Sequence, residues 1–117
     1  MKSLSSLSET EVQNSILEFL YFKKIDAWRQ NNHGIYDHKR EAYRRKNKWE
    51  KHLGSPLDIA GILPDGTHLE IEVKKNEREK CTGGQLERIK VVTRNNGVAF
   101  KAFSLKCVKE NLKDYLT

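Results

Sequence analysis

Residues 58–74 read DIAGILPDGTHLEIEVK, which is the pattern of a β-hairpin. The turn is Pro64-Asp65-Gly66, because proline suits the first turn position, aspartate bonds the local backbone and glycine accepts a left-handed conformation. A three-residue loop at this turn sets a register in which Asp58 lies opposite Glu72. Directly opposed residues have Cβ atoms about 4.5–5.5 Å apart, so these two carboxylates repel each other unless a cation lies between them. A divalent metal ion is the natural candidate.

The second strand of the hairpin separates apolar from charged side chains. One face carries Thr67, Leu69, Ile71 and Val73, and the other carries His68, Glu70, Glu72 and Lys74. Alternation places Glu72 and Lys74 on the same side, roughly 6.5–7 Å apart. A solvated strand face with an ordinary cross-strand ion pair has the same alternation, but a register that adds Asp58 favours a functional site. Glu70 ranks second, because the register places it opposite Ala60 and away from Lys74.

Length and composition predict a single polar globular domain over residues 1–117. Hydrophobic residues make up 37% of the chain and charged residues 32%, which suffices for one modest core. The sequence has neither an apolar run of roughly 18 residues, as a membrane span requires, nor a visible signal peptide. Cys81 and Cys107 lack metal-ligand spacing, so we expect free thiols in a reducing compartment. We therefore expect an intracellular, cytoplasmic protein with no membrane partner.

Positive charge gathers in a basic variable segment at residues 35–52. It holds seven basic and three acidic residues, so it carries +4 of the net charge of +6. Tyr36, Tyr43 and Trp49 are interleaved with the basic residues, a combination that suits phosphate contacts and stacking on unpaired bases. A solvated basic segment with its aromatic residues docked on the core is the alternative. The candidate nucleic-acid contacts in this segment are Lys39, Arg40, Arg44 and Arg45.

The rest of the chain predicts three helices and two further strands. Ser8 and Glu11 form a capping box for the first helix, and Ser104 can cap the last. The expected elements are helices at 9–22, 85–93 and 105–116 and strands at 25–29 and 98–103. Residues 38–51 permit a helix but lack an apolar stripe, so their structure stays open. The order αβ, variable segment, ββαβα predicts one layered α/β core.

Asp58, the run Glu72-Val73-Lys74 and an acid near the start of the first helix resemble the PD-(D/E)xK nuclease superfamily. Within it, the chain resembles the virus-type replication-repair nuclease (VRR-NUC) domain. The likeness covers most of the chain and also includes Gln13, residues 29–34, residues 54–58, Gln85 and Gly97. One departure is that Leu57 separates Pro56 from Asp58. The resemblance implies a restriction-endonuclease-like α/β core, with a central mixed β-sheet flanked by helices.

The same resemblance implies residue roles. Asp58 and Glu72, helped by the backbone carbonyl of Val73, would bind Mg²⁺ or Mn²⁺, ions that prefer hard oxygen ligands. Lys74 would orient or deprotonate the attacking water and stabilise developing charge. Gln85 would lie at the edge of the site and position Lys74 or the phosphate; its alternative role is that of a helix N-terminal residue.

The acid on the first helix is either Glu9 or Glu11. Glu11 has a structural role in the capping box, whereas helical spacing puts Glu9 on the inward face with Val12, Ile16 and Leu20. We therefore choose Glu9 as the metal-associated acid. The resemblance also makes Arg29 and Asn32 candidate nucleic-acid contacts. The four histidines show no ligand spacing, and we expect His68 to be exposed near the turn.

Stand-alone VRR-NUC domains resemble small Holliday-junction resolvases. A four-way junction has two symmetric strands to cut, and a two-fold dimer with two sites matches that symmetry. We expect a homodimeric, metal-dependent, structure-selective DNA endonuclease with no cofactor beyond the metal, which a phage could encode and use in its host. The first and last helices are candidate dimer surfaces. The alternatives are a non-catalytic nucleic-acid-binding module, a monomeric flap or single-strand nuclease, and a subunit that depends on a helicase.

Overall fold

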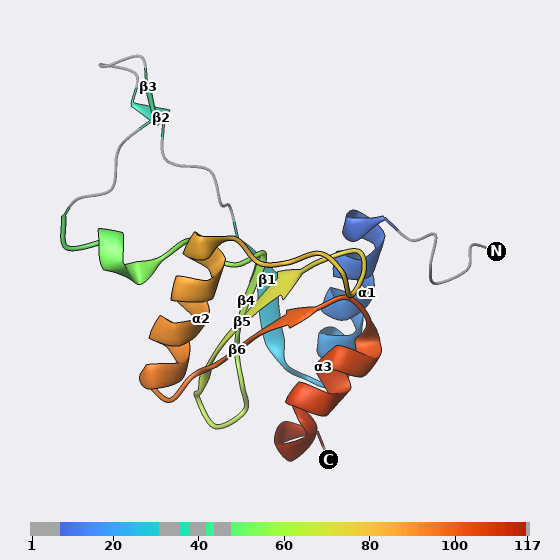
Figure 1. Ribbon diagram of the computed structural model, residues 1–117. Helices are drawn as coiled ribbons and strands as arrows, with labels where there is room; N and C mark the ends of the chain where they lie inside the picture. Colours follow the sequence, from blue (N-terminus) through green and yellow to red (C-terminus); the bar gives the residue numbers. More distant parts are fainter. Residues whose placement is uncertain (1–7, 31–35, 38–41, 44–47, 117) are drawn as a thin grey trace.

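A four-stranded mixed sheet forms the centre of the computed structural model, which describes residues 8–30, 36–37, 42–43 and 48–116 (Figure 1). Its strands lie in the order β1 (Asp26–Arg29), β4 (Ile59–Ile62), β5 (His68–Val73) and β6 (Val98–Ala102). The first three are antiparallel, and β6 runs parallel to β5. The predicted α/β class, the mixed sheet and the element order αβ-ββαβα are confirmed.

The β4–β5 hairpin has the predicted register. Ile59 pairs with Ile71 and Ala60 with Glu70. The loop is closed by hydrogen bonds between Leu63 and Thr67 and from the Gly66 N–H to the Leu63 carbonyl. Gly66 has φ +90°, a backbone conformation that favours glycine. The turn chemistry of residues 64–66 therefore fixes which side chains face each other along both strands.

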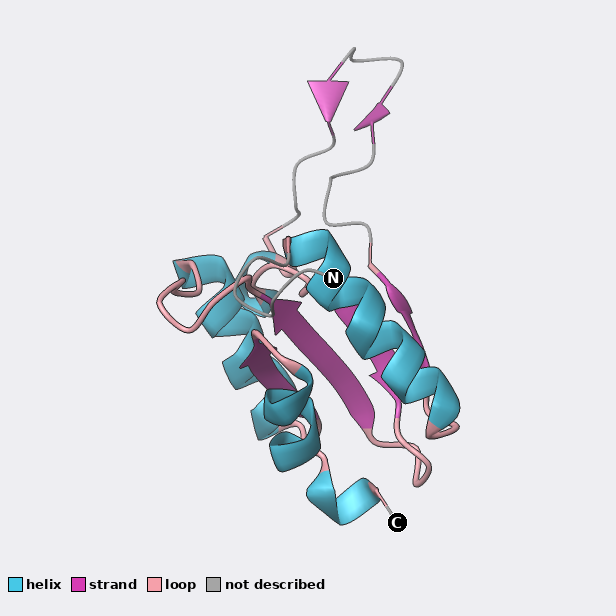
Figure 2. Cartoon of the chain, turned by 90° about the vertical axis from the view of Figure 1, so that its right-hand side faces the viewer, coloured by secondary structure: helices cyan, strands magenta, loops and turns pink. Residues whose placement is uncertain are grey.

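Helices cover both faces of the sheet. Figure 1 shows α2 (Gly83–Arg94) on one side, where it lies against β5 and β6, and α1 (Glu9–Phe22) and α3 (Leu105–Asn111) on the other. Figure 2 looks onto the side of α1 and α3. The apolar core lies between these two helices and the sheet, and it includes Val12, Ile16, Leu20, Ile59, Ile71, Val73, Phe100, Val108 and Leu112. The charged face of β5 is consequently the face toward α2.

Capping residues set where the helices begin. The Ser8–Glu11 capping box starts α1, and Ser104 caps α3, as expected. Helix α2 begins at Gly83, two residues before the expected start, because Thr82 is its N-cap and Gln85 completes a second capping box. The last helix is shorter than expected, since α3 ends at Asn111 and is followed by the 3₁₀ turn η3 (Lys113–Tyr115).

The described part of the basic segment is not α-helical. Strand β2 (Tyr36–Asp37) pairs with β3 (Ala42–Tyr43) in an antiparallel ribbon, and a 3₁₀ turn, η2 (Lys51–Leu53), precedes β4. The helix that residues 38–51 would permit is thus excluded at 42–43. Cys81 and Cys107 are free thiols, as predicted. Within the described ranges, no helix has both the length and the apolar composition needed to cross a membrane.

Candidate functional site

Asp58 and Glu72 meet where the β4–β5 ladder ends. Asp58 directly precedes β4, and the pairing of Ile59 with Ile71 makes Glu72 its opposed residue. The Asp58 Oδ2 atom accepts a hydrogen bond from the Val73 N–H at 2.9 Å. Since the N–H and C=O of a strand residue point to the same partner strand, the Val73 carbonyl also points toward Asp58. Two carboxylates and one carbonyl thereby converge at this end of the sheet.

The charged face of β5 is buried beneath α2. Glu70 is 0% exposed, Glu72 2% and Lys74 8%. The interpretation of this face as a solvated surface with an ordinary ion pair is therefore wrong. Acidic and basic side chains are seldom buried to this degree without partners, so each of the three must be accounted for by its contacts.

The environment of Glu72 disfavours its ionised form. Burial, followed by the neighbouring Asp58 carboxylate, raises the pKa of Glu72 from 4.5 to about 8. The Lys74 ammonium lies 3.6 Å from Glu72 Oε2 and lowers the pKa of Glu72, but by less than burial and Asp58 raise it. Within the described part of the chain, Glu72 Oε1 is buried and has no hydrogen-bond partner. A buried acceptor left unsatisfied costs about 1–3 kcal/mol, and a cation beside Oε1 would remove that cost.

Lys74 is held in place by Gln85. The Lys74 Nζ donates to Gln85 Oε1 at 3.1 Å, and the same oxygen accepts the Thr82 N–H at 2.8 Å. The two roles that the sequence left open for Gln85, contact with Lys74 and helix capping, occur together. Helix α2 thus begins at the position where its cap can orient the site lysine.

The acid of α1 that faces the site is Glu9. Its pKa is raised by partial burial and then by Asp58 and Glu79, while Lys74 and Lys75 act to lower it. Glu11 instead accepts the Ser8 backbone N–H and side chain within the capping box. The expectation that Glu9 turns inward with the apolar stripe is wrong, because its side chain is exposed at the rim of the site.

The residues present fit a hard divalent cation, although they do not form a complete cage. Among the described residues, no three His, Cys, Asp or Glu side chains are grouped closely enough to hold a metal by themselves. Mg²⁺ is commonly bound by one or two carboxylates, with water and phosphate oxygens completing its coordination. Asp58, Glu72 and the Val73 carbonyl provide such a set, and the unsatisfied Oε1 of Glu72 is the atom that most needs a cation.

Glu70, beside this pair, is fully satisfied. Its two oxygens accept from the Leu57 N–H at 3.0 Å, Gln30 Nε2 at 3.0 Å, Arg88 Nε at 2.9 Å and His68 Nε2 at 2.8 Å. Burial acts to raise the pKa of Glu70, but the bonds from His68 and Leu57 and the Arg88 charge outweigh it and lower the pKa. His68 is half exposed, as expected, yet it is tied to this carboxylate. Glu70 is accordingly a structural anchor.

Glu70 holds together the two stretches of chain on either side of the basic segment. Gln30 and Leu57 flank that segment, and Gln30 also donates through Nε2 to the Leu57 carbonyl at 3.0 Å and through its N–H to the Asp58 carbonyl at 2.8 Å. The sequence did not identify Gln30 or Arg88. The sequence carried no signal for these contacts, because Arg88 and Gln30 lie 18 and 40 residues from Glu70 along the chain.

Gly54 brings the returning chain against α2. Its φ is +71°, and a Cβ at this position would lie 2.5 Å from the backbone nitrogen of Arg88. The adjacent Ser55 N–H donates to the Gly84 carbonyl at 3.0 Å. Only glycine allows this close approach, which seats the residues just before Asp58.

The predicted nucleic-acid contacts are only partly described. Arg29 ends β1 on the exposed surface, where its Nε donates to Gln13 Oε1 of α1. Asn32, Lys39, Arg40, Arg44 and Arg45 lie outside the described residues.

Four segments contribute to the candidate site: the start of α1, the residue before β4, the end of β5 and the start of α2. They bring together the six residues that the sequence singled out, Glu9, Asp58, Glu72, Val73, Lys74 and Gln85. The described basic residues nearest in sequence to β4, Lys48 and Lys51, are exposed. No family model, curated protein or solved structure matches this chain.

Proposed function

We propose that the chain is a metal-dependent DNA endonuclease of the PD-(D/E)xK type, similar to VRR-NUC domains and with a restriction-endonuclease-like core. The observation that carries this proposal is the buried Glu72 carboxylate opposite the partly buried Asp58, with an unsatisfied Glu72 oxygen and Lys74 held beside it. A buried acid whose pKa is raised to about 8 by burial and by a neighbouring carboxylate is poorly suited to a purely structural role. The net charge of +6 supports a polyanionic substrate.

Asp58, Glu72 and the Val73 carbonyl would hold Mg²⁺ or Mn²⁺, with Glu9 at the rim. When bound, the ion would polarise the scissile phosphate and make a coordinated water more acidic. Glu72 must lose its proton before it can bind a cation, so metal binding should weaken as the pH falls below about 8.

Lys74 acts on the attacking water and the phosphate. Its ammonium is fixed between Glu72 Oε2 and Gln85 Oε1. The lysine is therefore already in place before the reaction begins. A preorganised cation of this kind stabilises negative charge that develops on phosphate oxygens. Gln85 is a positioning residue, since its contact is with Lys74.

Cleavage of supercoiled plasmid and of a synthetic four-way junction tests the proposal. Cleavage is expected with Mg²⁺ or Mn²⁺ and should stop with EDTA. Glu72→Gln and Lys74→Ala should each lower the rate at least about 100-fold, whereas Lys75→Ala, at the exposed neighbouring position, should cleave like wild type. Unchanged cleavage by Lys74→Ala would overturn the mechanism. Wild-type protein that binds DNA but cuts nothing with either metal would be a binding module.

We further propose a homodimer that prefers four-way junctions. The support is the match between a two-fold dimer and the two strands to be cut. Size-exclusion chromatography with light scattering should give twice the monomer mass of 13.6 kDa. A monomer that cuts flaps or single strands faster than junctions would replace this substrate assignment and leave the metal chemistry in place.

A further inference from the structure

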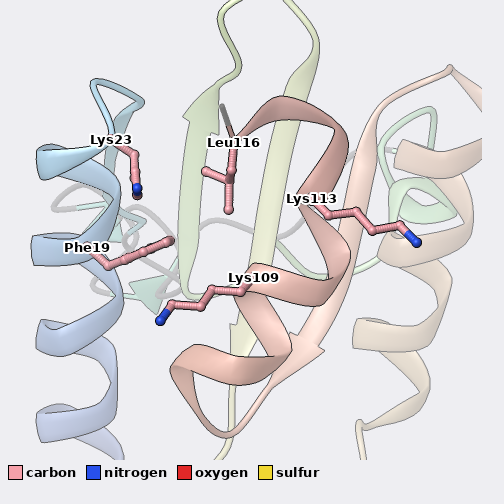
Figure 3. A pocket seen from close by; sticks show the side chains of 5 residues that line it. All are labelled: Phe19, Lys23, Lys109, Lys113 and Leu116. Carbon is pink, nitrogen blue, oxygen red and sulfur yellow. The ribbon is translucent and has the colours of Figure 1, made fainter.

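A groove lined by lysines lies between α1 and the C-terminal helical segment. Its volume is about 340 Å³, and it is lined by Phe19, Lys23, Lys109, Lys113 and Leu116. Figure 3 shows Lys23 and Lys109 reaching toward Phe19 from opposite sides, while the ammonium of Lys113 leads away. None of the described residues that line the groove is acidic. It is therefore a small apolar hollow with a positively charged rim.

Two of its ammonium groups share one aromatic ring. Lys23 Nζ lies 5.8 Å and Lys109 Nζ 5.6 Å from the centroid of Phe19. Over the described ranges, neither lysine forms an ion pair with a carboxylate. Cation–π contacts of this kind orient the ammonium groups but do not neutralise them. Among the described residues, no carboxylate balances the charge of this rim, which therefore suits an external anion.

We propose that this groove binds the phosphodiester backbone of DNA at a distance from the cleavage site, an inference that rests on the proposed nuclease function. Charge complementarity selects this occupant. A two-fold dimer formed through the groove would set the same patch on both subunits face to face and would bring lysine against lysine. Phosphates neutralised by lysine ammonium groups provide salt-sensitive affinity without sequence specificity.

The length of α1 sets the distance between the groove and the candidate cleavage site. Glu9 at its first residue borders the candidate site, and Lys23 directly follows its last residue. A 14-residue helix is about 21 Å long, which corresponds to roughly six base pairs of duplex. A DNA arm that follows α1 would meet the groove only if it extends about six base pairs or more beyond the cut. The groove should thus favour substrates with long arms.

Fluorescence anisotropy with labelled duplex DNA in EDTA tests this inference without cleavage. The double variant Lys23→Gln/Lys109→Gln should bind about 10-fold more weakly at low salt, and its slope of log K against log salt should be smaller by about 2. The matched control is Lys90→Gln/Lys106→Gln, which removes the same charge from exposed positions elsewhere. Lys23→Arg/Lys109→Arg should bind like wild type.

Arm length provides the second readout. With junctions whose arms are about 12 base pairs long, the groove variant should lose affinity, and with arms of about 4 base pairs it should match wild type. Equal losses in the groove and control variants, or a loss independent of arm length, would overturn the inference. So would a change in oligomeric state with DNA affinity intact, which would assign the groove to a second copy. Failure of cleavage alone would count against the proposed function and not against the groove.

Discussion

Glu72 makes stability depend on pH in a direction opposite to that of an ordinary ion-paired carboxylate. The pKa of Glu72 is about 8 in the folded protein and 4.5 in the unfolded chain, where the residue is not buried. Between these two pH values the unfolded chain therefore binds fewer protons than the folded one. Stability is then full below about pH 4.5 and falls as the pH rises toward 8. Thermal melts in EDTA should show the melting temperature decreasing by about 5 °C or more across this range.

The variant Glu72→Gln provides the control for this prediction. An amide cannot ionise, so the variant should show a flatter profile and melt above wild type at pH 8 in EDTA. Mg²⁺ or Mn²⁺ should raise the melting temperature of wild type at that pH and leave the variant nearly unchanged. A wild type that becomes more stable between pH 5 and 8 would contradict the assignment of a buried, protonated Glu72.

Variants of Thr82 and Gln85 can distinguish helix capping from the contact with Lys74. Both belong to the capping box of α2, but only Gln85 contacts Lys74. Thr82→Ala and Gln85→Ala should each lower the free energy of unfolding by about 1 kcal/mol in urea titrations. Only Gln85→Ala should also lower cleavage markedly, by about 10-fold. Equal rates for the two variants at equal stability would show that the Lys74 contact has no catalytic consequence.

At the scale of elements, α2 is joined to the sheet by the Glu70–Arg88 pair. Removing one partner leaves a buried charge uncompensated, which costs about 3–5 kcal/mol. Glu70→Ala should therefore lower the free energy of unfolding by that amount, and Glu70→Gln, which keeps the shape and some acceptors, should lower it less. Urea titrations measure both variants. A loss under about 1 kcal/mol for Glu70→Ala would show that the anchor is dispensable.

Two glycines with positive φ allow the cost of a steric clash to be compared with the cost of the backbone conformation alone. Gly54 and Gly66 have φ of +71° and +90°, but a Cβ would clash with the α2 backbone only at Gly54, and nothing lies within 4 Å of that position at Gly66. Gly66→Ala should cost about 1 kcal/mol. Gly54→Ala should cost at least about 1 kcal/mol more, because the segment before Asp58 must move away from α2. Equal costs in thermal melts would indicate that this segment is free to shift.

For the whole molecule, the parts that could be predicted are those set by short-range chemistry. The turn at 64–66 determined the register, and with it the meeting of Asp58 and Glu72. Burial could not be predicted, because a period of two looks the same whether water or α2 covers the face. The partners of Glu70 were also out of reach, since Arg88 is 18 residues away along the chain and Gln30 is 40. Such contacts depend on how α2 and the basic segment return to the sheet.

The anchor at Glu70 has a consequence for how this chain can change over time. Because Gln30 and Leu57 are bound to one carboxylate and to each other, the two ends of the intervening segment stay together whatever joins them. Insertions, deletions or exchanges between Gln30 and Lys51 need not disturb Asp58, since Leu53, Gly54 and Ser55 hold the returning chain against α2. The core and the basic segment can thus diversify separately, one keeping its chemistry while the other adapts to new targets.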